Sequence, residues 1–421
     1  MVSAYRAVTW LYMAIPVIAA LLALVRSRRR CSFAPLRGFG LTGLIGTAIG
    51  LVLSVLYSMG LHGRIPAGQL IATCYWSFSI ACLLVVFNRF LAIGIQRSMG
   101  LVLRDRANRP MAEVGGALIR AALLLAIGVP YVLSMVLVFR PRIVRPGTPT
   151  SLLSATYQNI SFDATDGTRL KGWWIPATKT DRTDEHHPAQ SWGTRTIILC
   201  HGFGADKASD LRLVRDLVPN GYNVFALDFR AHGQSDGQLT TFGALERNDV
   251  LGAVRWVKAN HPQESERVFG LGESMGAAAL INAAADESAE GQSIEAIAVF
   301  APFDRLNQLL KGVADFHYAP AAGWLAANVG LPIAGAHLGI NILKFSPSVS
   351  VQSLWPRPLL VLASDEDRGI DSRRGRALFD SAMQPKFHYW TSKGSRETIL
   401  FNDDDAALTV RIFFETSRSI L

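Results

Sequence analysis

The first third of this chain has no lysine and almost no acidic residues. Residues 1–140 contain 14 arginines but only two acids, Asp105 and Glu113, so their local net charge is +12. Because the whole chain of 421 residues carries +9, everything after residue 140 carries −3. The basic excess therefore belongs to the front of the chain, where arginines alternate with long apolar runs. This pattern is typical of the flanks of membrane helices and argues against a nucleic-acid-binding surface.

Cysteine is also scarce, with four residues in the chain, and their spacing fits neither a metal site nor a disulfide framework. They do not settle the redox compartment. The adjacent His186 and His187 lie in a polar segment next to a proline, which favours a solvated loop over a metal site. We therefore expect no metal and no organic cofactor. No internal repeat is visible.

Four nearly uncharged runs open the sequence, at about 7–25, 39–61, 70–87 and 118–139. Each has the roughly 17–25 residues that a helix needs to cross a bilayer. A cleaved signal peptide is the rival interpretation of the first run, but its charges follow the apolar core instead of preceding it, which favours a retained helix. Buried helices of a soluble bundle are the other alternative. We expect residues 1–145 to form a membrane region with about four transmembrane helices.

The distribution of arginine predicts the orientation of this region. Ten arginines lie in the first and third connecting loops, whereas five lie at the N-terminus, in the second loop and after the last run. Arginine-rich loops stay in the cytoplasm, so both ends of a four-helix region are expected outside it. The sequence therefore predicts an integral protein of the inner or plasma membrane whose C-terminal domain is extracytoplasmic.

After a proline-punctuated connector at 141–149, the pattern changes to alternating strands and helices. A hairpin signal, Asp166-Gly167, separates two β-like runs. Continuous apolar strands with helices between them predict an α/β domain over 146–421 with a mostly parallel sheet covered on both faces. A partly apolar helical insertion at 304–345 is a candidate lid. Strands are expected at 157–162, 169–175, 195–200, 223–227, 267–271, 295–300, 358–363 and 386–390, and helices at 206–218, 243–259, 275–286, 372–382 and 404–418.

The domain is organised around Gly272-Glu273-Ser274-Met275-Gly276, which lies between a predicted strand and a predicted helix. A serine in G-x-S-x-G at such a junction sits on a sharp turn that exposes its hydroxyl above the sheet. The start of the helix supplies backbone N–H groups and a partial positive charge for an oxyanion. His201-Gly202-Phe203-Gly204 follows an earlier strand, where a second oxyanion donor belongs. The expected donors are the amides of Met275 and Phe203.

These motifs, together with Leu170–Pro176 and Asp228-Phe-Arg-Ala-His-Gly-Gln-Ser235, occur in the order and spacing of one family. From about Tyr157 to its end the chain resembles an α/β-hydrolase. The resemblance is to the branch of serine esterases and S33-type peptidases that includes the membrane-associated Bem46-like hydrolases. It implies an α/β-hydrolase fold with a helical lid, and a nucleophile at Ser274. Residues 1–145 lie outside the resemblance.

The resemblance also places the catalytic acid, at Asp367, with Asp365 as the alternative. The family histidine is missing. In the turn after the last strand, Arg396 occupies its position, and arginine cannot act as a general base because its pKa exceeds about 12. After Asp367 the only histidine is His388, which falls inside a predicted strand. Three accounts remain open: His388 is displaced into the site, His317 or His337 of the lid replaces it, or the domain has weak or no turnover.

The sequence therefore predicts a membrane-anchored serine hydrolase that cleaves an ester, thioester or amide. Ser274, Asp367 and His388 would form the triad, and His201 and His232 match family positions near the pocket that are not the base. The expected partners are the membrane and a small-molecule or lipid-like acyl substrate, without nucleic acid; protein partners are not predicted. The alternative function is a hydrolase-like binding or scaffold module at the membrane.

Overall fold

The computed structural model describes Val138 and residues 142–178, 193–317, 323–324, 326–367, 369–392 and 403–420. The four apolar runs predicted to span the membrane, and with them the predicted orientation, lie outside these residues. No helix within the described ranges is both long and apolar enough for a transmembrane span. The compact unit that contains the sheet comprises Val138–Pro332 and Asn341–Leu421. The domain boundary at residue 145 stays a prediction.

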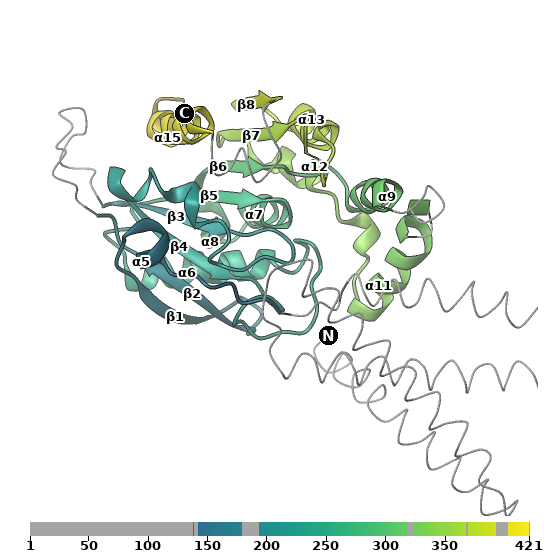
Figure 1. The fold of residues 1–421 in the computed structure, drawn as a ribbon, viewed down its shortest axis with the longest axis horizontal. Coiled ribbons are helices and arrows are strands. Elements are labelled where there is room, and N and C mark those ends of the chain that lie inside the picture. The colour runs from purple at the N-terminus through teal and green to yellow at the C-terminus, as the bar shows by residue number, and fades with distance from the viewer. Residues whose placement is uncertain are drawn as a thin grey trace, which may run out of the picture. The chain divides into compact units, whose positions relative to one another are not determined.

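An eight-stranded sheet forms the centre of this unit, in the order β1-β2-β4-β3-β5-β6-β7-β8 (Figure 1). β1 and β2 form an antiparallel hairpin and β2 is antiparallel to β4, whereas every later pair is parallel. The predicted mostly parallel sheet is confirmed. The strands are β1 (Gln158–Asp163), β2 (Arg169–Ile175), β3 (Arg195–Cys200), β4 (Tyr222–Asp228), β5 (Arg267–Glu273), β6 (Ile294–Phe300), β7 (Leu359–Ser364) and β8 (Lys386–Thr391).

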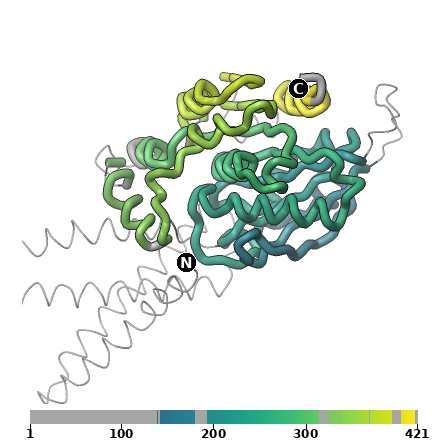
Figure 2. The backbone as a smooth tube through the Cα atoms, turned by 180° about the vertical axis from the view of Figure 1, so that it is seen from behind, coloured from purple at the N-terminus to yellow at the C-terminus, as the bar shows by residue number. Residues whose placement is uncertain are grey.

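Helices cover both faces of the sheet (Figure 2). One apolar core packs α6, α7 and α13 against one face, and a second packs α15 and two 3₁₀ turns, η3 and η4, against the other. The described helices are α5 (Pro149–Leu153), α6 (Arg247–Asn260), α7 (Met275–Ala284), α8 (Ala289–Gln292), α9 (Leu306–His317), α11 (Leu331–Leu338), α12 (Pro347–Ser350), α13 (Ser372–Ser381) and α15 (Asp404–Ile420).

The burial of the central strands matches their parallel pairing. Every residue of β3, β4 and β7 is buried, as expected for strands covered by helices on both faces. In contrast, only the inward-facing Phe162 of β1 is buried, because β1 is the edge strand of the hairpin. The turn between β1 and β2 contains Gly167 at φ +85°, which confirms the predicted hairpin.

The prediction of a helix at 206–218 is wrong. The chain there forms η3 (Leu211–Val214) and η4 (Val218–Asn220). Polar groups at the start of this segment bond to distant parts of the chain instead: the Lys207 amide donates to Asp228 at 2.7 Å. Pro219, inside η4, cannot donate the backbone hydrogen bond that a continuing helix needs.

Between β6 and β7 the chain is helical, as predicted for the insertion. It contains α9, α11, α12, a π turn η5 (Ala326–Gly330) and two 3₁₀ turns, η6 (Ile342–Lys344) and η7 (Val351–Leu354). Residues 333–340, within and just after α11, fall outside the compact unit of the sheet. Whether the insertion acts as a lid stays a prediction.

Candidate active site

Ser274 lies at the point where β5 ends and α7 begins. Its backbone has φ 51° and ψ −109°, a left-handed conformation that non-glycine residues rarely adopt. Such strain costs about 1–3 kcal/mol and persists only where the surroundings enforce it. The Ser274 amide donates to the carbonyl oxygen of Phe300 at 2.9 Å, which ties the turn to the neighbouring strand β6. The predicted sharp turn is present.

Glycine at position 276 permits this turn. A Cβ atom added to Gly276 would lie 2.2 Å from the carbonyl oxygen of Cys200, so any side chain would drive α7 away from the end of β3. A Cβ atom on Gly272 would likewise lie 2.9 Å from the Ala277 amide nitrogen. The two glycines therefore allow strand, turn and helix to approach within contact distance of the backbone.

The two predicted oxyanion donors come from the ends of neighbouring strands. Met275 is the first residue of α7, so its amide has no acceptor within the helix. Phe203 lies in the loop that leaves β3, and β3 pairs with β5 so that Cys200 faces Gly272. The loop packs closely on the turn, because a Cβ atom on Gly202 would lie 2.8 Å from the Glu273 carboxylate. The positions of both residues fit the predicted role.

His201 and His232 hold this loop and do not act as bases. His201 Nε2 accepts from the Phe229 amide at 3.1 Å, and its Nδ1 contacts the Gly202 carbonyl oxygen at 2.8 Å. Burial lowers the pKa of His201 to about 3, so its ring stays neutral. His232 Nε2 accepts from the Gly204 amide at 3.2 Å. Each imidazole therefore has an acceptor nitrogen bound to the protein backbone, as the resemblance implied for residues other than the base.

A buried ion pair fixes the far side of the loop. The Asp228 carboxylate is fully buried and pairs with Lys207 at 2.5 Å. It also accepts from the amides of Lys207 and Gln234, at 2.7 and 2.9 Å. A Cβ atom on Gly233, at φ +48°, would lie 2.2 Å from this carboxylate. The Asp228–Ser235 motif thus folds closely around the buried carboxylate of Asp228 and has a structural role.

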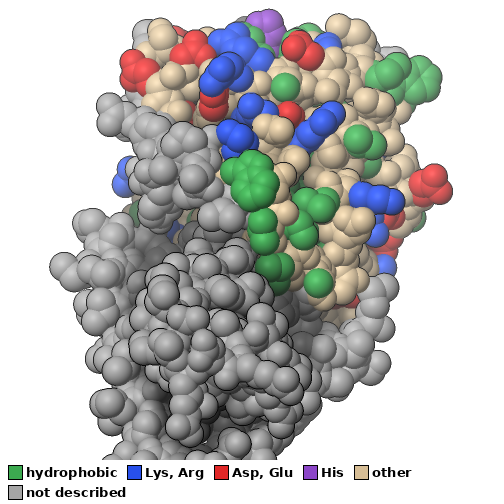
Figure 3. Space-filling view, turned by 90° about the vertical axis from the view of Figure 1, so that its right-hand side faces the viewer, with side chains coloured by type: hydrophobic (Ala, Val, Ile, Leu, Met, Phe, Trp, Pro, Cys, Tyr) green, Lys and Arg blue, Asp and Glu red, His purple; other side chains and the backbone are tan. Residues whose placement is uncertain are grey.

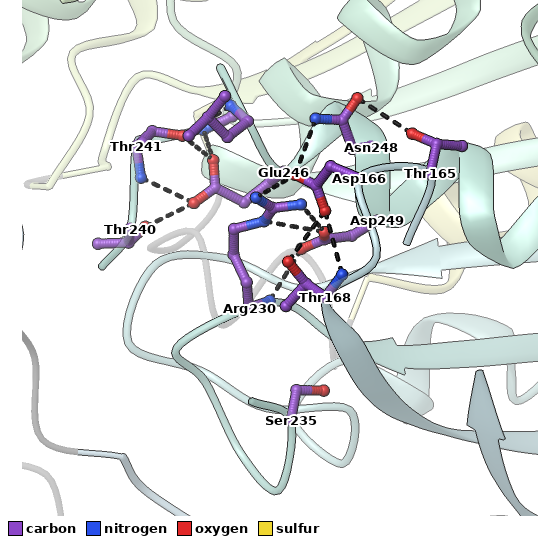
Figure 4. A network of polar contacts seen from close by, with 12 residues as sticks. Thr165, Asp166, Thr168, Arg230, Ser235, Thr240, Thr241, Glu246, Asn248 and Asp249 are labelled. Atoms are coloured by element: carbon purple, nitrogen blue, oxygen red, sulfur yellow. Dashed lines mark hydrogen bonds and ion pairs between the residues drawn. The ribbon is translucent and has the colours of Figure 1, made fainter. Parts of the chain in front are cut away.

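Arg230 forms a second polar network (Figure 4). Its guanidinium donates to Asp249 at 2.9 Å through Nε and to Asp166 at 2.7 Å through Nη1. Burial alone would lower the pKa of Arg230, but the attraction of Asp249 and the hydrogen bonds to both carboxylates raise it above its usual value. The Arg230 carbonyl oxygen contacts His232 Nδ1 at 2.9 Å. This network therefore supports the histidine that binds the Gly204 amide.

Asp367, the predicted acid, has one bound and one open carboxylate oxygen. Its Oδ1 accepts from the amides of Gly369 and Ile370, at 2.7 and 3.0 Å. Its Oδ2 is buried and has no hydrogen-bond partner within the described ranges. A buried carboxylate oxygen without a partner is costly, so this atom is suited to accept from another group. Within the part of the chain that the structure describes, no base pairs with this oxygen.

Asp365, the alternative acid, already accepts hydrogen bonds from side chains on α13. Its carboxylate accepts from the Ser372 hydroxyl at 2.6 Å and from Arg376 at 3.0 Å. These two hydrogen bonds lower the pKa of Asp365 below its usual value. Its side chain is half exposed, so it forms part of a surface ion pair. The geometry favours Asp367 over Asp365.

His388 does not lie where a base is needed. It is in β8, and three strand spacings of about 4.8 Å, roughly 14 Å, separate β8 from β5. Its ring stacks on Trp390 at 5.0 Å and meets the edge of Phe379 in α13 at 5.1 Å. An imidazole held on β8, three strands away from β5, cannot reach the Ser274 hydroxyl. The structure therefore corrects the expectation that His388 is displaced into the site and completes the triad.

The side chains of His317 and His337, the remaining candidates for the base, are not described. Arg396 and its turn belong to 393–402, outside the described residues. The Ser274 hydroxyl has no hydrogen bond to any described residue, and Ser274 is 6% exposed. Within these ranges no cluster of three or more potential metal ligands occurs.

One supporting group was missed by sequence reasoning. The fully buried Glu246 accepts from the Thr241 amide at 2.7 Å and from Thr240 Oγ1 at 3.0 Å. Thr240 Oγ1 also contacts the sulfur of Met275 at 3.3 Å, beside the predicted oxyanion donor. A glutamate three residues after Gly243, at the start of a helix, was the available signal, because such a residue often binds amides of the preceding turn.

Comparison with known families identifies the class of this domain. Residues 194–338 match the family model of serine aminopeptidase, S33. The chain is 27% identical over 229 residues to the uncharacterized protein YfhR of Escherichia coli K12, covering 54% of this chain and 69% of that protein. It is 29% identical over 241 residues to the uncharacterized protein YqkD of Bacillus subtilis, covering 55% and 75% of the two chains.

Two further likenesses concern a lipase and a solved esterase. The lysophosphatidylserine lipase ABHD12 of Danio rerio is 23% identical over 220 residues, covering 51% of this chain and 54% of that protein. The esterase Pf2001 of Pyrococcus furiosus superposes with a TM-score of 0.52 at 24% identity, covering 66% of this chain and 99% of the esterase. The second likeness shows the α/β-hydrolase fold. Residues 194–338 therefore place this domain with the S33-type α/β-hydrolases, and the comparisons support a hydrolase of the esterase or peptidase type.

Proposed function

We propose that this hydrolase is membrane-anchored and cleaves an ester, thioester or amide through an acyl-enzyme on Ser274. One observation carries the proposal: Ser274 is held at φ 51° at the N-terminus of α7. A strained turn that costs about 1–3 kcal/mol is retained where it serves a function, and here it presents a hydroxyl to unpaired helix amides.

In the proposed mechanism the Ser274 oxygen attacks the substrate carbonyl carbon while a base takes the hydroxyl proton. The carbonyl π electrons move to oxygen, and the amides of Met275 and Phe203 stabilise this oxyanion. The tetrahedral intermediate collapses, the C–X bond breaks, and the base returns the proton to the leaving group. Water, deprotonated by the same base, then cleaves the acyl-enzyme. Each oxyanion donor of this kind contributes about 10²–10³-fold to turnover.

We infer that the base is a histidine whose side chain is not described, and that it pairs with Asp367. The open Oδ2 of Asp367 supports this inference, because it would accept from imidazole Nδ1 and so orient the ring. His317 and His337, from the insertion, remain the candidates. His388 is no longer one, for the reasons given above.

We propose a lipid-like acyl substrate that reaches the site from the membrane. The insertion carries exposed apolar side chains, among them Trp324 at 56% and Leu343 at 48%, and Val349 just after it is 65% exposed. Figure 3, which views the side of the molecule that carries α9, has apolar side chains gathered on that face. The zebrafish relative is a lysophosphatidylserine lipase, and residues 1–140 have the composition of a membrane region. We further propose that the hydrolase domain is extracytoplasmic.

A hydrolase-like scaffold with weak or no turnover is the second candidate. The substitution of Arg396 for the family histidine favours it. Loss of the base lowers turnover by about 10⁴–10⁶-fold, because the serine hydroxyl is then weakly nucleophilic. Such a domain would still bind acyl ligands at the oxyanion amides.

A fluorophosphonate probe applied to membranes that contain the full chain tests the proposal. We expect labelling of the parent and of Ser381→Ala, a serine control on α13, and none of Ser274→Ala. Labelling that persists in Ser274→Ala would refute the assignment of the nucleophile. Esterase activity that appears only on Arg396→His would favour the scaffold, whereas a parent that His317→Ala or His337→Ala inactivates would identify the base.

A further inference from the structure

A buried carboxylate joins the loop that carries Phe203 (residues 201–205, here called the oxyanion loop) to the connector at 141–149. Asp206, which is 3% exposed, follows the His201–Ala205 segment directly. Its Oδ2 accepts from the Arg145 amide at 2.6 Å, and its Oδ1 accepts from the Ser209 hydroxyl at 2.9 Å. Oδ1 also accepts from the Ala208 amide at 3.2 Å. A buried carboxylate with three donors fixes the residues that supply them.

The Arg145 side chain strengthens this contact. Its Nη1 donates to the Ser209 hydroxyl at 2.9 Å and lies 3.8 Å from Asp206 Oδ1. Ser209 Oγ in turn accepts from the Asp206 amide at 3.0 Å. Arg145 thus neutralises Asp206 and closes a ring of contacts with Ser209. The partners are 61 and 64 residues apart in the chain, so local folding of the loop does not create this arrangement.

On its other side, the loop that carries Phe203 is held by a bond within the loop and by residues at and just after the end of β4. Within it, the Ala205 amide donates to the Gly202 carbonyl oxygen at 3.2 Å, and the Gly204 amide donates to His232. The Lys207 amide donates to Asp228. Asp206, between Ala205 and Lys207, is the point at which the connector binds the loop. Loss of its charge would free the segment just after the predicted oxyanion donor.

We propose that Asp206 is a positioning residue for the oxyanion loop, and that Arg145 couples the connector to it. Asp206 holds residues 202–205 so that the Phe203 amide meets the developing oxyanion, and Arg145 keeps Asp206 in place. The inference rests on the proposed role of Ser274. It adds that the segment leading into the hydrolase domain forms part of the support of the catalytic machinery.

Kinetics of the full chain in detergent, with a p-nitrophenyl ester, test the proposal. We expect Asp206→Asn to lower kcat by about tenfold or more, less than the about 10²–10³-fold lost with a whole donor. KM should change by less than about twofold, because the loop acts on the transition state. A trifluoromethyl ketone, whose adduct carries an oxyanion, should bind more weakly by the same factor as kcat falls.

Arg145→Met should also lower kcat and inhibitor affinity together, but by less than Asp206→Asn does. Arg145→Lys should retain part of the kcat that Arg145→Met loses. Arg215→Met is the matched control, because Arg215 is half exposed and its ion pairs with Asp216 and Asp404 lie on the surface. Parental kcat and inhibitor affinity in Asp206→Asn would overturn the proposal. If the affinity for an uncharged product analogue fell by the same factor as kcat, the proposal would also be overturned, because such a result indicates general unfolding.

Amide hydrogen exchange separates this proposal from the proposed function, because it needs no turnover. If fluorophosphonate does not label Ser274 in the parent, the proposed function fails. The positioning role would still require faster exchange at residues 202–209 in Asp206→Asn and Arg145→Met than in the parent or in Arg215→Met. Unchanged exchange in both variants would refute the contact's role in holding the loop.

Discussion

Replacing Ser274 by glycine tests whether the turn is strained. At φ 51° and ψ −109° a residue with a Cβ atom pays about 1–3 kcal/mol, whereas glycine adopts this region freely. Glycine also loses about 0.4–1 kcal/mol relative to alanine, because the unfolded chain becomes more flexible. The difference predicts that Ser274→Gly is more stable than Ser274→Ala by about 0.5–2 kcal/mol.

Urea denaturation of the two variants, followed by tryptophan fluorescence, measures this difference. Both lack the hydroxyl, so its loss cancels in the comparison and the backbone contribution remains. In thermal unfolding, a gain of about 1 kcal/mol corresponds to roughly 2–4 °C for a domain of 150–250 residues. Equal stability of the two variants, or a less stable Ser274→Gly, would show that the turn stores no strain and would remove the main support for Ser274.

Three further predictions concern the site and its frame. Asp367→Asn should lower kcat by about 10⁴-fold, because it no longer fixes the base in its productive orientation, while Asp365→Asn should stay near the parent; equal effects of the two would contradict the assignment of the acid. Gly276→Ala should destabilise the domain by more than about 3 kcal/mol and prevent labelling of Ser274, since its Cβ atom would lie 2.2 Å from the Cys200 carbonyl oxygen; a parental melting curve would contradict this packing. Burial lowers the pKa of His201 to about 3, from about 6.5 in the unfolded chain. Below pH 6.5 the unfolded chain therefore binds a proton that the folded chain does not, and the free energy of unfolding should fall by about 3 kcal/mol at pH 4.5. His201→Gln should lose less stability than the parent between pH 7 and pH 4.5, and equal acid sensitivity would argue against the depressed pKa.

The sheet and the sharp turn at Ser274 could be predicted because the residues that determine them are adjacent in sequence. Wholly buried strands such as β3 and β4 require continuous apolar runs, and these runs are visible without any structure. The turn at Ser274 needs glycine at fixed offsets, and Gly272 and Gly276 provide it. Residues that are close together in sequence were therefore enough to predict the turn at Ser274 and the loop that follows β3.

The predictions that failed depend on contacts between distant residues. Local pattern favoured a helix over 206–218, but Asp206 and Lys207 bind Arg145 and Asp228, and these bonds hold the segment in another conformation. His388 was the only histidine after Asp367, yet its orientation is set by Phe379 of α13. The sequence placed His388 inside a strand, but it did not show which side chains its ring would contact.

The central claim is that Ser274 carries the acyl group, and a trapped intermediate tests it most directly. The full chain is mixed with an excess of a p-nitrophenyl acyl ester, quenched in acid within the first turnovers, digested, and analysed by peptide mass spectrometry. We predict an acyl adduct on the peptide that contains Ser274, and its absence in Ser274→Ala. Ester hydrolysis by the parent with the adduct on another residue, or undiminished hydrolysis by Ser274→Ala, would contradict the account.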